Sequence, residues 1–210
     1  MPDYAWQTTE TRAGTRVFVE CEHTARSLGN LLTLTAAKGP MLYKAAGLSL
    51  ERRIALEEGD EKALRLFAKY RPDSVQGALD IWRAAHPAGG FVEVLEDGAA
   101  FTYPSLSIQS AVQLSVAMVK QAARQRSVCG IVRDTPNPKY AFRCWLLQMG
   151  MSGPEYSDCR AELLRRLPGD IAYAKPEQNP RLAQVIQPQE QEIEQEPQPA
   201  LEPEITMEWT

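Results

Sequence analysis

Basic side chains that could contact phosphate groups gather in the second half of the chain. Arginine and lysine bind phosphate oxygens through charge-assisted hydrogen bonds, and helices that carry several of them can lie against a nucleic-acid backbone. The residues that we expect to form such a surface are Lys120, Arg124, Arg126, Arg143, Arg160, Arg165 and Arg166. Binding to DNA or RNA is therefore one function that the sequence suggests.

The segment from 139 to 167, KYAFRCWLLQMGMSGPEYSDCRAELLRRL, has the pattern of two short amphipathic helices joined at Gly150. A glycine in the turn and apolar residues on both sides are typical of a DNA-binding helix-turn-helix. An αα-hairpin that only packs against the core has the same pattern. Bulky Leu146 and the lack of base-reading amides favour the packing hairpin somewhat, and both interpretations stay open. Ser152 and Glu155 have the spacing of a capping box for the second helix.

Residues that could support catalysis or bind a metal are few. The two histidines are His23 and His86, and Cys21-x-His23 offers two metal ligands where a site needs three or four. An acidic run at 57–61 could hold a cation, but a solvated loop and helix start explains it more simply. The sequence contains no phosphate-binding loop, dinucleotide fingerprint, zinc-protease motif or hydrolase elbow. We therefore expect no metal, no cofactor and no enzymatic activity. A catalytic triad of Cys21 or Cys159 with a distant histidine stays open, because triads are recognised by geometry, and nothing in the sequence favours it.

The charge is unevenly distributed along the chain. Residues 1–103 carry 12 basic and 14 acidic side chains, residues 104–175 carry 10 and 5, and residues 176–210 carry 1 and 8. A basic body with an acidic tail is compatible with a polyanionic partner, and equally with a tail that only keeps the protein in solution.

Hydrophobic periodicity predicts the elements that must position these residues. Alternation in TRVFVECE indicates a strand at about 15–22, and Thr24 is a helix N-cap before a helix that Gly39-Pro40 interrupts. The further elements that we expect are a short helix from Pro40 to Gly47, two helices within 51–88 with Asp73 capping the second, strands at 91–95 and 99–103 around an Asp97-Gly98 turn, and a helix at 105–127.

These elements predict an α+β fold in which helices pack on a small antiparallel sheet of about three strands. Residues 1–14 are expected to be a polar leader, and residues 15–175 a single domain with a helical insertion at 51–88. Residues 176–210 are rich in Gln, Glu and Pro and are expected to be a disordered acidic tail, whose apolar end around Trp209 could be a docking motif.

The chain has no apolar run near the roughly 18 residues that span a bilayer, and its start lacks the features of a signal peptide. We expect a cytoplasmic protein with no membrane partner. The four cysteines form no CxxC pair, so free thiols are expected.

The matching residues of a family resemblance lie mainly in 139–173. KYAFRCWLLQMG, then GPEY, a basic helix and LPGDIAY resemble the C-terminal region of proteins from mobile elements and prophages of Firmicutes that are called "virulence-related protein". The segments RVFVE and AAKGPMLYKAAG are similar to earlier parts of those proteins. Residues 51–88 and the acidic tail have no counterpart in the family pattern, which has no assigned catalytic residues.

The resemblance implies a phage or mobile-element accessory protein that acts by binding. The first expectation is a non-catalytic protein that binds a host or element protein, for example as an anti-defence, anti-CRISPR-like inhibitor. The alternative is a DNA- or RNA-binding accessory factor that uses the basic helices. A protein target would need an exposed apolar anchor. Trp82, Trp145 and Trp209 are the candidates, although each is expected to belong to the core or the tail unless it is found exposed.

Overall fold

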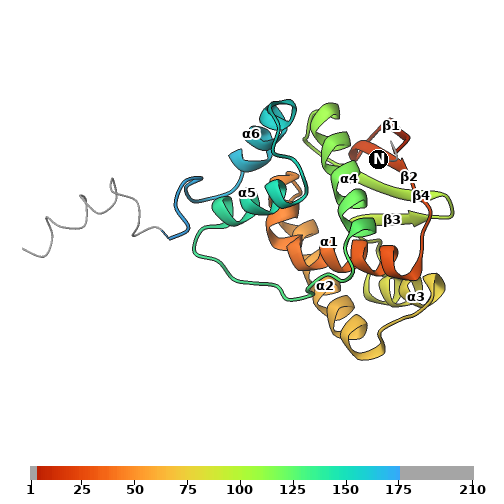
Figure 1. The fold of residues 1–210 in the computed structure, drawn as a ribbon. Coiled ribbons are helices and arrows are strands. Elements are labelled where there is room, and N and C mark those ends of the chain that lie inside the picture. The colour runs from red at the N-terminus through yellow and green to blue at the C-terminus, as the bar shows by residue number, and fades with distance from the viewer. Residues whose placement is uncertain (1–3, 176–210) are drawn as a thin grey trace, which may run out of the picture.

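The computed structural model describes residues 4–175 and confirms the predicted α+β fold: helices pack against one four-stranded antiparallel sheet (Figure 1). Its elements are β1 (Trp6–Thr11), β2 (Gly14–Glu20), α1 (Ala25–Ala45), α2 (Leu50–Tyr70), α3 (Val75–Ala85), β3 (Val92–Leu95), β4 (Gly98–Tyr103), α4 (Ile108–Arg124), α5 (Pro138–Gln148), a 3₁₀ turn at Pro154–Tyr156 and α6 (Ser157–Arg165).

The sheet has the strand order β1-β2-β4-β3, with antiparallel pairing throughout. The alternation seen in the sequence sets the faces of β2, where Val17 and Val19 are buried against the helices and Phe18 points to the other face. On β4, Phe101 and Tyr103 are fully buried on the same side. Tyr103 hydrogen-bonds through its hydroxyl to Ser115 Oγ of α4, 2.8 Å away, so the sheet and α4 form the centre of the core.

The predicted polar leader is wrong for residues 6–11, which form β1 and add a fourth strand to the sheet. Every residue of β1 is exposed, so the segment WQTTET shows no alternation of apolar and polar residues. A strand without a buried face leaves no periodic signal in a sequence. Gly14, with φ of +117°, follows the turn that joins β1 to β2.

The second hairpin is confirmed, with a shifted turn. Leu95 pairs with Gly98, so the turn residues are Glu96 and Asp97 and not Asp97-Gly98. Gly98 begins β4, where a side chain on it would lie 2.3 Å from the carbonyl oxygen of Val19 on β2. The glycine is therefore needed for close packing between the strands.

The predicted break at Gly39-Pro40 is also wrong, because α1 continues through Pro40 as one helix of 21 residues. Thr24 caps it through a reciprocal pair of hydrogen bonds with Ser27. A proline inside a helix costs about 3 kcal/mol. Here Leu42 and Tyr43 beyond it are fully buried, and this burial keeps the last turns helical.

The helices α2 and α3 confirm the predicted pair, although Ser74 and not Asp73 caps the second. They contribute Leu56, Phe67 and Trp82 to the common core. The acidic run at 57–61 is not a solvated loop, because it lies inside α2 and its Asp60 is buried. This pair of helices is thus packed as an integral part of the domain.

Both ends of α4 are held by side chains that are far away in the sequence. At its end, Asn30 of α1 donates to the carbonyl oxygens of Ala122 and Gln125, at 3.1 and 2.7 Å. At its start, the Glu162 carboxylate of α6 accepts hydrogen bonds from the backbone N–H and the hydroxyl of Ser107, the N-cap residue, at 3.0 and 2.7 Å. Tertiary contacts therefore fix both limits of this helix.

The C-terminal helical hairpin is confirmed, with Gly150 in the left-handed conformation (φ +89°) at its turn. The predicted capping box is wrong, because a 3₁₀ turn begins after Gly153 without a side-chain cap. Asn137 caps α5 and donates to the carbonyl oxygens of Asp170 and Tyr173, which holds the end of the described chain against this helix.

Three further expectations concern the C-terminal tail, membrane-spanning helices and the cysteines. The tail at 176–210, with Trp209, lies outside the described residues. Within residues 4–175, no helix combines the length and the apolar character that a bilayer crossing requires. All four cysteines are free thiols, as expected.

Candidate functional site

Two of the seven predicted nucleic-acid-binding residues hold the fold together. Arg160 donates to the carbonyl oxygens of Met151 and Gly153, at 2.6 and 2.9 Å, and so closes the turn between α5 and α6. Arg166 donates to Ser105 O at 2.8 Å and lies near the end of α1. These carbonyl oxygens hold both guanidinium groups in place, so Arg160 and Arg166 have structural roles.

The other five are spread over the surface. Arg124 and Arg126 are exposed around the end of α4, Arg165 is exposed on α6, and Arg143 is half-buried on α5. The ammonium group of Lys120 lies 5.9 Å from the centre of the Tyr4 ring. The seven residues thus lie on α4, α5 and α6 or directly after them, and do not share one helix face.

The outward side of α6 does not have the charge of a recognition helix. Its exposed residues are Ser157, Asp158, Ala161 and Arg165, one acidic and one basic. The helix has nine residues, and its other side packs on α4 and α5. The packing interpretation of the hairpin is consistent with this arrangement.

Two of the four cysteines, Cys21 and Cys159, are poorly placed to act as nucleophiles. Burial raises the pKa of Cys21 to about 11, and it raises the pKa of Cys159 to about 11 as well. Both side chains are therefore protonated near neutral pH, where a nucleophile needs the thiolate. His23 Nε2 lies 2.9 Å from the carbonyl oxygen of Gly98 and must donate to it, which fixes the tautomer of His23.

A buried polar cluster, formed by Tyr43, Asp60 and His86, joins α1, α2 and the end of α3. Tyr43 donates through its hydroxyl to Asp60 Oδ2 at 2.6 Å, and His86 Nε2 lies 3.1 Å from Asp60 Oδ1. Burial raises the pKa of Asp60, while the hydrogen bonds from His86 and Tyr43 act to lower it. Gly39 makes room for the carboxylate, because a methyl group there would lie 2.5 Å from Asp60 Oδ2.

The hydrogen-bonding atoms of this cluster are engaged within the protein. His86 Nδ1 lies 3.2 Å from the carbonyl oxygen of Trp82 and must carry a proton. The contact between Nε2 and Asp60 needs a second proton, held by the imidazole or the carboxyl group. Since both nitrogens of His86 are engaged, neither can accept a proton from a bound molecule. We assign the cluster to packing between the helices.

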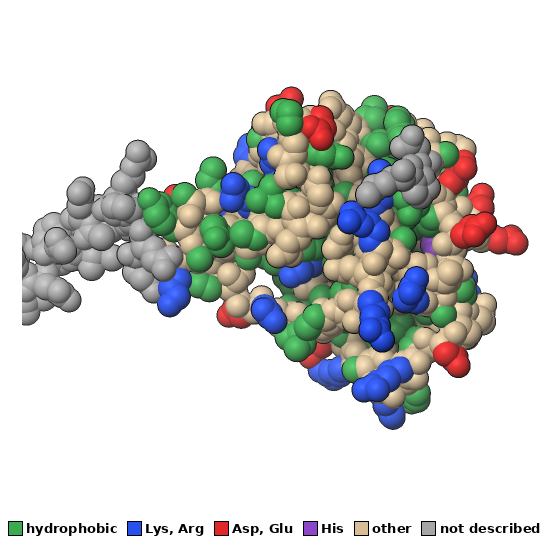
Figure 2. All heavy atoms as spheres, in the orientation of Figure 1, with side chains coloured by type: hydrophobic (Ala, Val, Ile, Leu, Met, Phe, Trp, Pro, Cys, Tyr) green, Lys and Arg blue, Asp and Glu red, His purple; other side chains and the backbone are tan. Residues whose placement is uncertain are grey.

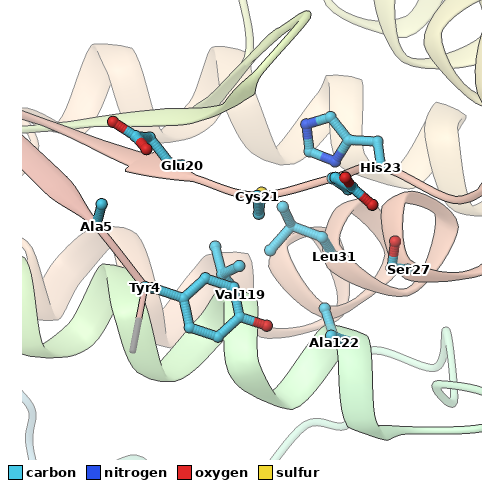
Figure 3. A pocket seen from close by; sticks show the side chains of 11 residues that line it. Tyr4, Ala5, Glu20, Cys21, His23, Ser27, Leu31, Val119 and Ala122 are labelled. Carbon is cyan, nitrogen blue, oxygen red and sulfur yellow. The ribbon is translucent and has the colours of Figure 1, made fainter. Parts of the chain in front are cut away.

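An open cavity of about 440 Å³ lies where β2 ends, between the start of the described chain, α1 and α4 (Figure 3). Cys21 points into it from the strand, and the Tyr4 ring lies beside Val119 of α4. Leu31 and Ala122 add apolar surface. Glu20, Glu22 and His23 supply its polar groups. Within residues 4–175, no three His, Cys, Asp or Glu side chains are placed to hold a metal ion.

A second cavity, of about 340 Å³, lies next to the first, and Tyr4 lines both. Its apolar walls come from β1, α4 and the turn before α6, and its residues include Trp6, Val112, Val116, Met149 and Tyr156. We call the two cavities together the Tyr4–Trp6 groove. Trp6 lies opposite Val19 in the register, so it is on the helix-facing side of the sheet.

Trp6 is the exposed tryptophan that sequence reasoning missed. Its side chain is 49% exposed, whereas Trp82 and Trp145 are 4% and 5% exposed and belong to the core. Trp82 and Trp145 are therefore not exposed anchors, in line with the core position that the sequence favoured for them. The available signal was an aromatic residue within a polar segment. No neighbouring apolar residue joins Trp6 in a periodic pattern that would assign it to a buried face.

Carboxylates outnumber cations along the Tyr4–Trp6 groove. Glu20, Glu22 and Glu155 line it, against one ammonium group, that of Lys120. Figure 2 shows acidic side chains gathered at the right-hand edge, beside the strand ends, and Lys and Arg side chains across the lower half. The groove therefore repels phosphate groups and suits a neutral or cationic ligand.

Comparison with protein-family models, curated proteins and solved structures found no match to this chain. Fold and groove define a small α+β protein with an aromatic, acid-rimmed groove beside an edge strand. The likeness to mobile-element "virulence-related" proteins stays a prediction.

Proposed function

We propose that this is a non-catalytic binding protein whose partner is another protein, bound in the Tyr4–Trp6 groove. The observation that carries the proposal is the half-exposed Trp6 side chain, which lines one of two adjacent cavities that share Tyr4. Tryptophan and tyrosine are the residues that most often supply the binding energy of protein interfaces. The groove offers both, together with an apolar wall from α4.

The biological setting of this proposal comes from the sequence resemblance alone. It is that of a phage or mobile genetic element, whose accessory protein binds a host or element protein in the cytoplasm. An anti-defence inhibitor of the anti-CRISPR kind would act in this way, by occupying a surface that its target needs. The groove supplies a surface for such an interaction.

The test is affinity capture from an extract of the host cell with the full chain, followed by reconstitution of each captured complex from purified proteins. Trp6→Ala should weaken the reconstituted complex by about tenfold or more, the effect of a central aromatic anchor. The matched control is Ile108→Ala, which removes an apolar side chain that is also half-exposed but lies outside the groove. Equal affinities of Trp6→Ala and wild type would exclude the groove.

A second candidate, nucleic-acid binding, is favoured by one observation. Arg124, Arg126 and Arg133 are exposed within ten residues of one another, at the end of α4 and in the loop after it. Anisotropy of labelled duplex and single-stranded DNA across a salt series would detect such binding, with a steep salt dependence expected. Arg124→Glu with Arg126→Glu should abolish it, whereas Arg165→Glu on α6 should have little effect. No binding at low salt would remove this candidate.

A further inference from the structure

The outer edge of β1 has backbone groups that the sheet leaves unpaired. Glu20 N–H donates to Ala5 O at 2.9 Å, so Ala5 is one of the residues whose N–H and C=O both face β2. Because this alternates along an antiparallel pair, Gln7 and Thr9 also face β2. The N–H and C=O groups of Trp6, Thr8 and Glu10 then point outward from the edge of the sheet.

The two edges of the sheet differ in protection. β3 is four residues long, and its Glu93 forms an ion pair with Arg16 of β2 across the sheet at 2.6 Å. β1 is six residues long, contains no proline or lysine, and is exposed along its whole length. Natural proteins shield edge strands by shortening them or by adding lysine or proline. β1 lacks these devices and is therefore open to another strand.

We propose that the outer edge of β1 binds an extended segment of a protein partner by strand addition. An apolar side chain of that segment would enter the groove beside Trp6, and a Lys or Arg side chain would face the carboxylates around it. This inference rests on the proposed function and specifies how the partner binds. Backbone hydrogen bonds supply affinity in this mode, and alternate side chains supply specificity.

A second copy of this chain fits the edge less well. If β1 paired antiparallel with itself, with Thr8 opposite Thr8, each Trp6 would face a Glu10. The copy would bring no apolar side chain to the groove. A single added strand pair also buries far less than the roughly 1,200 Å² of a stable interface. A partner that fills the groove as well as pairing with the edge gains the missing area.

Charge further defines the partner segment. The acidic residues on the edge strand and around the groove are Glu10, Glu20, Glu22 and Glu155, and the basic side chain among them is Lys120. An acidic segment or a phosphate backbone would be repelled, whereas a segment with Lys or Arg would be attracted. We expect alternating apolar residues with at least one cation.

The experiment selects random peptides of about ten residues, long enough for one strand, on the immobilised full chain. The selected peptides are synthesised with a fluorescent label and titrated by anisotropy with wild type, Thr8→Pro and Thr8→Ala. Thr8→Pro removes an outward N–H and leaves the bonds to β2, since proline is tolerated on edge strands. Thr8→Ala removes the same side chain and keeps the N–H. Circular dichroism melting checks that both variants fold.

Support would be enrichment of basic, alternating peptides whose affinity falls by about tenfold or more in Thr8→Pro and stays within about twofold in Thr8→Ala. Equal binding to Thr8→Pro, enrichment of acidic peptides, or no enrichment would each overturn the inference. Sedimentation of the full chain tests the other occupant: a dimer that Thr8→Pro dissociates would assign the edge to a second copy.

The same peptides separate this inference from the function on which it rests. If Trp6→Ala weakens binding and Thr8→Pro does not, the groove binds protein without strand addition. If neither substitution changes binding, the proposed function and the strand-addition mode both fail.

Discussion

The buried polar cluster and the Tyr4–Trp6 groove contain similar side chains in opposite situations. In the interior, Tyr43 and His86 are both hydrogen-bonded to Asp60, and both nitrogens of the imidazole are engaged. Tyr4 and Trp6 lie at the surface with open space beside them. Residue type alone would have ranked the cluster as the functional site. Accessibility reverses that ranking, because a group that is already fully paired can bind nothing more.

The largest expected effect that tests this comparison is the loss of Asp60. Asp60→Ala leaves Tyr43 and His86 buried without their shared acceptor, and breaking a buried pair costs about 3 to 5 kcal/mol. Urea unfolding measures the change. Glu58→Ala, at an exposed position of the same helix, should change the free energy of unfolding by less than about 0.5 kcal/mol. A small effect at Asp60 would mean that the cluster is not structural.

The next largest expected effect on the free energy of unfolding is that of Gly39→Ala in α1, the helix that faces Asp60. In Gly39→Ala the added methyl group would lie 2.5 Å from Asp60 Oδ2 and 2.9 Å from the Tyr43 ring, so the cluster must shift. Such overpacking costs about 1 to 3 kcal/mol. Gly29→Ala in the same helix meets no atom within 4 Å and should stabilise the protein by about 0.5 to 1 kcal/mol. Thermal melting of both variants would show opposite signs.

A smaller, pH-dependent effect follows from the burial that raises the pKa of Asp60 above its ordinary value of 3.8. A raised pKa means that the folded state holds this proton more tightly than the unfolded state does. The resulting stability is fully present below pH 3.8 and is lost as the pH rises through the pKa of the folded state. Relative to Asp60→Asn, wild type should gain stability on acidification. Urea unfolding across pH checks the sign, and the opposite trend would contradict the assignment.

The smallest expected effect on stability is at the groove. Trp6→Ala should change the free energy of unfolding by less than about 0.5 kcal/mol while it weakens partner binding by about tenfold or more, because Trp6 lies at the surface. Trp82→Ala is the contrasting control and should cost about 3 to 5 kcal/mol, as for other buried aromatic residues. Chemical unfolding of the two variants separates a binding residue from a core residue. Equal costs would remove the distinction between the regions.

Where one face of an element is buried, the sequence was sufficient to predict it. The alternation of Val17 and Val19, and the glycine turn at 150, both correspond to observed structure. β1 could not be found in this way, because all its side chains are exposed. The proline in α1 was overridden by tertiary burial, which a local rule does not contain.

The candidate site was harder to predict than the fold. The groove combines residues from both ends of the described chain, such as Trp6 and Tyr156, and only the tertiary fold brings them together. The seven basic residues stay a predicted nucleic-acid-binding set, of which Arg160 and Arg166 are bound to backbone carbonyl oxygens. Their division into carbonyl-bound arginines and free ones depends on contacts such as that between Arg160 and Met151. No sequence pattern encodes such contacts.

The two distant caps of α4 have a consequence for how the chain folds as it leaves the ribosome. Asn30 is synthesised before α4 and is available to fix the end of that helix as soon as residue 125 emerges. Glu162, which fixes the start, emerges only about forty residues later. The first turn of α4 should therefore remain frayed during synthesis, and completion of α6 should close the domain. A chain that stalls before residue 162 would present that unfinished turn to chaperones and proteases.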